Sequence, residues 1–156
     1  MCFDKVDYYC DKAREAYCQT EKKEPLTEED EWEITRRAAN HIGFFLTWLI
    51  RRGFEGELHR ELPRALEEVR TGKLLGTDFF LKNCDGKFWD EDVSPEAQPF
   101  VVHYYDSGQY WRDYIDWVVN GLCGLPLEFV GSWEDYLRFE PLLDQAYQDF
   151  LDDTQG

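Results

Sequence analysis

The segment from residue 27 to residue 52 constrains the fold most strongly, because it has the pattern of one long helix that is apolar on two sides. Thr27 and Asp30 match a capping box at its start, and Gly53 suits the position just after its end. Apolar residues recur at helical spacing on two stripes, which are Ile34, Ala38, Ile42, Phe45 and Leu49, and then Phe44 and Trp48. A helix that is apolar on two sides is covered by other elements, so its second half should lie at the centre of the fold.

Further helices are expected on both sides of this central one. Their predicted ranges are 4–20, 57–70 with a bend or restart at Pro63, 76–81, 94–105 and 109–120. Residues 132–135 (SWED) form a further N-cap signature, and a last helix is expected from about residue 140. Residues 88–93 should form a loop or a short extended piece, and residues 125–130 a short strand or a linker. We therefore predict a mainly α fold, a single compact multi-helix domain of six or seven helices with at most a small β element.

The length of 156 residues fits one domain, and 43% hydrophobic residues are enough to form a core. No segment approaches the roughly 18 uninterrupted apolar residues of a membrane-spanning helix. The first residues show neither a basic leader nor an apolar stretch, so the expected compartment is the cytoplasm. The 5 cysteines include no CxxC pair, which indicates reduced thiols and argues against a disulfide or zinc framework.

The formal net charge of −16 is concentrated in the C-terminal half of the chain. Residues 84–127 carry 8 acidic and 2 basic side chains, and residues 128–156 carry 8 and 1. Such a field repels nucleic acid and anionic membranes and attracts proteins with basic surfaces. We expect a protein partner with a basic surface, and no direct binding of nucleic acid or membrane.

Motifs that would carry catalysis or cofactor binding are not found in the sequence. No GxSxG motif or glycine-rich phosphate loop occurs, and the three histidines lack metal-type spacing, so His41 is expected to be a hydrogen-bonded core or boundary residue. One calcium-loop pattern is partial, because Asn83, Asp85, Gly86 and Asp92 fit it but too few oxygen ligands accompany them. We predict no catalytic residue, no metal site and no cofactor.

Aromatic and acidic residues are mixed between residues 88 and 117, in a pattern typical of a protein-binding surface. On the helix predicted over 109–120, Trp111, Ile115 and Val118 form the expected inward stripe, which would leave other rings facing out. Tyr and Trp anchor interfaces, and acids around them attract a basic partner. The alternative is that these rings pack between helices. The predicted partner-binding residues are Trp89, Asp90, Glu91, Asp92, Tyr104, Tyr105, Asp106, Tyr110, Asp113, Tyr114 and Trp117.

Several segments also resemble a family of small bacterial proteins that are associated with polymorphic toxin systems and regarded as immunity proteins. The likeness rests on residues 39–48 (ANHIGFFLTW), Thr71-Gly72, residues 83–88 (NCDGKF), Tyr104-Tyr105, Tyr110, Asp113-Tyr114 and residues 132–136 (SWEDY). It runs over residues 38–151, and the first 37 residues depart from the pattern. The expected layout is one domain with an N-terminal helix in 1–25, a family-like helical core in 26–151 and a tail in 152–156.

The resemblance implies a cognate toxin as the partner, without saying which activity that toxin has. We therefore expect an immunity protein, not an enzyme, that binds and neutralises a toxin with a basic active-site cleft, such as a nuclease. Two alternatives remain open. One is a hydrolase or metal-dependent enzyme that uses His41 or His103 to reverse toxin damage, and the other is an acidic adaptor or scaffold protein.

Overall fold

The computed structural model describes residues 1–122 and 124–155, and it confirms a mainly α domain with a small β element. In chain order the elements are β1 (Cys2–Lys5), α1 (Asp7–Glu21), α2 (Glu28–Arg51), the 3-10 helix η1 (Glu57–Glu61), α3 (Pro63–Thr71), α4 (Gly76–Asn83), β2 (Lys87–Trp89), the 3-10 helix η2 (Asp90–Asp92), α5 (Gln98–Val101), the π-helical turn η3 (Val102–Asp106), α6 (Gln109–Trp117), the π-helical turn η4 (Val118–Leu122) and α7 (Trp133–Gln155). Within this described part, no helix is both long and apolar enough to cross a membrane.

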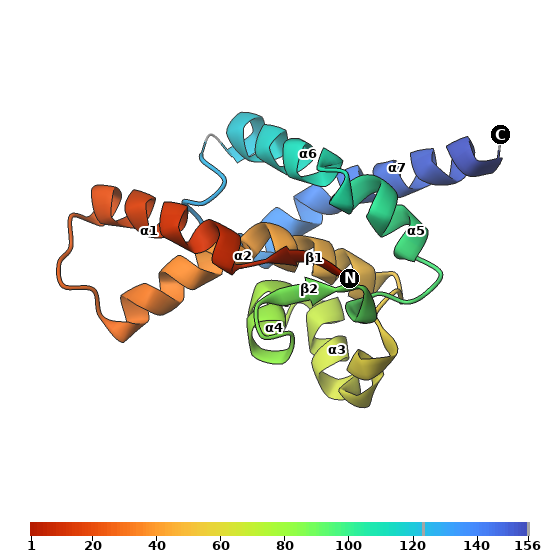
Figure 1. The fold of residues 1–156 in the computed structure, drawn as a ribbon, viewed down its shortest axis with the longest axis horizontal. Helices are drawn as coiled ribbons and strands as arrows, with labels where there is room; N and C mark the ends of the chain where they lie inside the picture. The colour runs from red at the N-terminus through yellow and green to blue at the C-terminus, as the bar shows by residue number, and fades with distance from the viewer. Residues whose placement is uncertain (123, 156) are drawn as a thin grey trace.

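Helix α2 is the centre of the molecule, as its two apolar stripes predict. Every residue from 38 to 50 is buried, and α1, α3, α4 and α7 all contact this helix. Its first half is less covered and runs beside α1, with which it forms an arm that extends away from the rest of the fold (Figure 1). The capping box is present, since the Thr27 side chain accepts the Asp30 amide and the Asp30 carboxylate accepts the Thr27 amide.

Helix α4 crosses α2 at very close range, through one glycine on each helix. A Cβ atom on Gly43 would lie 2.2 Å from Thr77 Oγ1, and a Cβ atom on Gly76 would lie 1.8 Å from Thr47 Oγ1. Only a residue without a side chain allows this approach. The crossing therefore fixes α4 on α2, and with it the position of Cys84 at the end of α4.

The β element is an antiparallel pair of β1 and β2, with Asp4 paired with Phe88. The prediction placed residues 4 and 5 in a helix, which was wrong. For residues 125–130 it left a short strand or a linker open, and the linker is correct. Residues 2–5 are extended because their pairing with β2 lets Phe3 pack on Phe88 and Asp4 point inward to His41, which outweighs local helical spacing. Residues 125–130 form turns and loop.

Two helices begin elsewhere than predicted. The helix expected from residue 94 begins at Gln98, because residues 95–97 form a turn in which the Ala97 amide donates to the Ser94 carbonyl. The N-cap signature at Ser132 is confirmed, since its hydroxyl accepts the Asp135 amide, but the helix that begins at Trp133 continues to residue 155, so the separate start near residue 140 was wrong. Pro141 lies inside this helix at an exposed position, where the carbonyl that it leaves without a helical partner can reach water.

Candidate functional site

The four tyrosines among the predicted partner-binding residues lie in the core, so their predicted exposure was wrong. Tyr104, Tyr105, Tyr110 and Tyr114 are all buried. Helix α6 turns Tyr110 and Tyr114 inward, and leaves Trp111 only half-buried. The sequence pattern predicted that the Trp111 face of this helix points inward, because tyrosine has a polar hydroxyl and is common at surfaces. In the structure each of the four hydroxyls has a hydrogen-bond partner inside the protein, so the rings can be buried.

Those partners explain why the rings can be buried. Tyr105 donates to Asp4 Oδ2 at 2.6 Å and Tyr104 donates to Asp113 Oδ2 at 2.6 Å. Tyr110 donates to the His41 carbonyl, and the Tyr114 hydroxyl accepts from Asn40 Nδ2 at 2.8 Å. Burial raises the pKa of all four hydroxyls above the ordinary tyrosine value, so they stay protonated.

The other predicted residues do not form one surface. Asp92 is buried, which also contradicts its predicted place on a binding face, and Trp117 is half-buried against Phe139. Asp106 is exposed on its own turn, and Asp113 is occupied by Tyr104. The structure leaves Trp89, Asp90 and Glu91 together at the surface.

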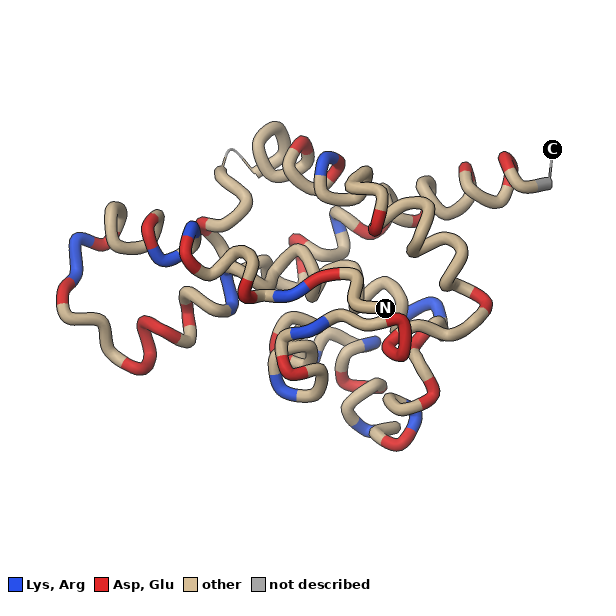
Figure 2. Tube along the Cα trace, in the orientation of Figure 1, with Lys and Arg blue, Asp and Glu red and all other residues tan. Residues whose placement is uncertain are grey.

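Asp90 and Glu91 border an open groove of about 600 Å³ beside the N-terminus. Its lining combines exposed apolar side chains with acids, and consists of Met1, Glu57, Leu58, Asp90, Glu91, Val93, Pro95 and Gln98. No lysine or arginine occurs among these lining residues. Figure 2 shows the acidic turn η2 as a continuous red stretch next to the N-terminus. Trp89 directly precedes this turn and is 40% exposed.

The groove exists because the backbones of two 3-10 turns, η1 and η2, are clamped together. The Gly56 amide donates to the Asp92 carbonyl at 2.9 Å, and the Ser94 amide donates to the Phe54 carbonyl at 2.8 Å. A Cβ atom on Gly56 would lie 1.8 Å from the Glu91 carbonyl oxygen, so only glycine fits here. The outer sides of the two turns carry Glu57, Leu58, Asp90 and Glu91.

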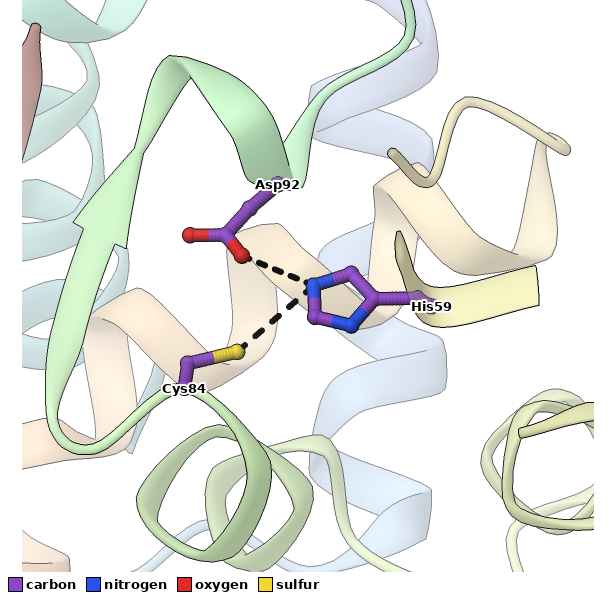
Figure 3. Close-up of side chains that lie close together, drawn as sticks. All are labelled: His59, Cys84 and Asp92. Atoms are coloured by element: carbon purple, nitrogen blue, oxygen red, sulfur yellow. Dashed lines mark hydrogen bonds and ion pairs between the residues drawn. The ribbon is translucent and has the colours of Figure 1, made fainter. Parts of the chain in front are cut away.

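The inner sides of the same turns carry a buried polar cluster, which Figure 3 shows. His59 Nε2 lies 2.8 Å from Asp92 Oδ1 and 3.7 Å from Cys84 Sγ. The ligand atoms of these three residues lie within 4.8 Å of one another, so the cluster could hold a metal ion. Burial raises the pKa of the Cys84 thiol, and the charge of Asp92 raises it further.

The cluster does not have the geometry of a nucleophilic relay. In such a relay the nucleophile approaches one ring nitrogen of histidine and the carboxylate holds the other. Here Cys84 and Asp92 both approach Nε2, and the raised pKa keeps the thiol in its weakly nucleophilic form. The sequence does not reveal this cluster, because its successive members are 25 and 8 residues apart, at no recognised metal-binding spacing.

A second buried histidine, His41, pairs with Asp4 near a smaller pocket. His41 Nε2 lies 3.3 Å from Asp4 Oδ2, which also accepts from the hydroxyls of Tyr9 at 3.1 Å and Tyr105 at 2.6 Å. Burial favours a higher pKa for Asp4, but the hydrogen bond and charge of His41, the Tyr105 hydroxyl and the Lys5 amide outweigh it and lower this pKa. The prediction of a hydrogen-bonded core histidine is confirmed.

The His59 cluster and the Asp4–His41 pair both lie in the part of the chain that matches a known protein family. A family model described as Domain of unknown function (DUF7832) matches residues 2–124. The chain belongs to this family. No curated protein and no solved structure matches it.

The DUF7832 match begins at β1, so it includes the first helix, and it stops before α7. The His59 cluster, the Asp4–His41 pair and all residues that line the groove except Met1 lie inside it. The candidate sites therefore belong to the family domain and not to the segment that follows it.

Proposed function

We propose that this DUF7832 protein acts by binding another protein, and that its partner is a bacterial toxin which it neutralises. The observation that carries the proposal is the acidic groove between η1 and η2, which is lined by Glu57, Asp90 and Glu91 together with Met1 and Leu58. Asp90 pairs with the N-terminal amine of Met1 at 3.1 Å, which leaves Glu57 and Glu91 as the free acids of the groove's lining. Acids at the rim speed the approach of a basic partner, and apolar side chains at the centre provide the buried contact.

The net charge of −16 supports a basic partner, because the whole molecule attracts positive surfaces over a Debye length. Toxins that act on nucleic acid carry basic clefts, and the groove is suited to cover such a cleft. The toxin as partner comes from the resemblance of residues 38–151 to immunity proteins. We place the binding in the cytoplasm, where such a toxin would meet its target.

A second candidate function is an enzyme that uses His41, since the Asp4–His41 pair lines a pocket of about 320 Å³. The geometry of the Asp4–His41 pair supports catalysis less well than the acidic groove supports protein binding. Asp4 occupies Nε2 of His41, and Nδ1 is buried with no hydrogen-bond partner. A general base needs a nitrogen within reach of the substrate, so this pair would first have to rearrange.

Co-expression with the product of the neighbouring gene tests the proposal. We expect the two proteins to co-purify at one to one, and the cells to survive the toxin. Absence of both co-purification and rescue would reject it. A His41→Ala variant that folds separates the candidates, because an inhibitor without this residue in its interface still protects, whereas an enzyme that depends on it binds but no longer protects.

A further inference from the structure

We propose that His59, Cys84 and Asp92 bind a zinc ion, with water in the fourth position. The site is a feature of the chain itself and is independent of the toxin partner. It would join the two turns that form the groove to the end of α4, since His59 lies on η1, Asp92 on η2 and Cys84 directly after α4 (Figure 3).

The contacts of His59 Nε2 with Asp92 and with Cys84 cannot both be hydrogen bonds, and the Cys84 thiol has the Asp92 carboxylate as its other acceptor. A neutral imidazole nitrogen offers either one proton or one lone pair in the ring plane. If Nε2 donates to Asp92 Oδ1, it has no lone pair left for the Cys84 thiol, and if it accepts from the thiol, it has no proton for the carboxylate. A cation at the common point would bind all three groups at once.

The distances fit a tetrahedral zinc site after a small opening. Zn–N and Zn–S bonds of about 2.1 and 2.3 Å place nitrogen and sulfur about 3.6 Å apart, and Zn–O bonds of similar length place nitrogen and oxygen about 3.3 Å apart. The structure has Nε2 3.7 Å from Cys84 Sγ and 2.8 Å from Asp92 Oδ1. Of these two pairs, only the second must separate, by about half an ångström, and all three ligand atoms lie within 4.8 Å of one another.

The donor set selects zinc over calcium or magnesium. Thiolate and imidazole are the ligands of zinc and its neighbours, while calcium and magnesium require oxygen ligands in larger number. Binding would replace the thiol proton of Cys84 by the metal and release that proton to water. The product carries a thiolate and a carboxylate against a dication, so the buried site becomes neutral.

The surroundings hold two ligands in the required orientation. Asp92 Oδ2 accepts the Trp89 amide at 2.8 Å, which leaves Oδ1 for the metal. The His59 ring packs edge-on against Phe79, with ring centres 5.3 Å apart. Contacts of this kind fix metal ligands before the metal arrives and raise its affinity. Cys84 is half-buried, so the site has a side open to solvent.

Equilibrium dialysis of the tag-free full chain against zinc tests the proposal without any toxin. We expect one zinc per chain, and Co²⁺ at the same site should give the charge-transfer absorption of a thiolate ligand. Cys84→Ser, His59→Gln and Asp92→Asn should each weaken binding at least tenfold. The matched controls Cys18→Ser and His103→Gln, which change a half-buried thiol and an exposed imidazole elsewhere, should bind as the wild type does.

A second measurement needs only the wild-type chain, in case a variant fails to fold. Zinc should protect Cys84 from alkylation, as read by mass spectrometry, while Cys18 keeps its reactivity. The proposal is overturned if the wild type takes up no zinc, or if folded variants of the three ligands bind it unchanged. It is equally overturned if zinc leaves the alkylation rate of Cys84 as it was. Loss of toxin binding with zinc binding intact would reject only the function proposed above.

Discussion

Two buried histidine–aspartate pairs in this protein differ in the side chains that surround them. In the first, Asp4 accepts hydrogen bonds from Tyr9 and Tyr105 in addition to its contact with His41. In the second, the Cys84 thiol approaches the same nitrogen of His59 that faces Asp92. The first carboxylate is saturated by phenol hydroxyls, whereas the second pair leaves a thiol and an imidazole aimed at one point.

The comparison shows that a buried His–Asp pair does not by itself indicate a function. Hydroxyl donors stabilise the charged form of a carboxylate and complete its coordination, so the Asp4 site is suited to holding β1 against α2. A thiol beside the pair adds a third group that can bind a metal ion, so the Asp92 site is suited to a cation.

The largest expected effect is loss of stability when His41 is removed. His41→Ala leaves Asp4 in the core without its histidine, and it opens a cavity beside Trp111, so the free energy of unfolding should fall by about 3–5 kcal/mol. His59→Ala, measured in the presence of a chelator, should cost only about 1–2 kcal/mol, because Asp92 keeps the Trp89 amide. Urea unfolding of both variants checks this order, and a larger loss in His59→Ala would contradict the division.

A smaller effect is expected when one hydroxyl is removed from the first site. Tyr105→Phe takes a short hydrogen bond from the Asp4 carboxylate without changing the packing, and it should lower the free energy of unfolding by about 2 kcal/mol. Tyr8→Phe is the control, since Tyr8 is 66% exposed and should change stability by less than about 0.5 kcal/mol. Equal changes in the free energy of unfolding for the two variants would show that the Tyr105 hydroxyl does not stabilise the buried Asp4 carboxylate.

The smallest expected effect is on the pH dependence of stability. The pKa of Asp4 is lowered in the folded protein, so its contribution is present above the unfolded pKa of about 3.9 and is lost as the pH falls through the folded pKa. Below about pH 4, Asp4→Asn should therefore lose stability less steeply with acid than the wild type. If the stabilities of the two proteins instead fell in parallel from pH 5 to pH 2.5, the pKa of Asp4 would be the same in the folded and unfolded states, which would contradict the lowered pKa.

The fold could be predicted where a local signal and the tertiary contacts agree. The Thr27 capping box, the buried half of α2 and the restart of the chain at Pro63 follow from spacing and cap chemistry. Strand β1 could not be predicted, because residues 2–5 become extended only by pairing with β2, more than 80 residues later in the chain. A non-local contact of this kind leaves no local pattern.

The candidate site also depends on contacts between residues far apart in the sequence, which the sequence alone does not reveal. The sequence identified acids and rings between residues 88 and 117, but it could not tell Tyr110 and Tyr114 from surface anchors, since their buried partners lie on α2. Asp90 and Glu91 remain at the surface, while Asp92 turns inward to His59. Glu57 and Leu58, which complete the groove, come from a turn that sequence spacing does not connect to residue 90.

The most direct test of the central claim compares two charge-reversed forms of the protein. One carries Glu57→Lys and Glu91→Lys in the groove, and the other carries Glu15→Lys and Asp153→Lys at exposed positions on α1 and α7. Both change the net charge equally, so any difference in toxin affinity at low salt reports on the groove alone. We predict about a ten- to hundredfold loss of affinity in the groove variant and a much smaller loss in the other. Equal losses in the two variants would contradict a docking site between η1 and η2.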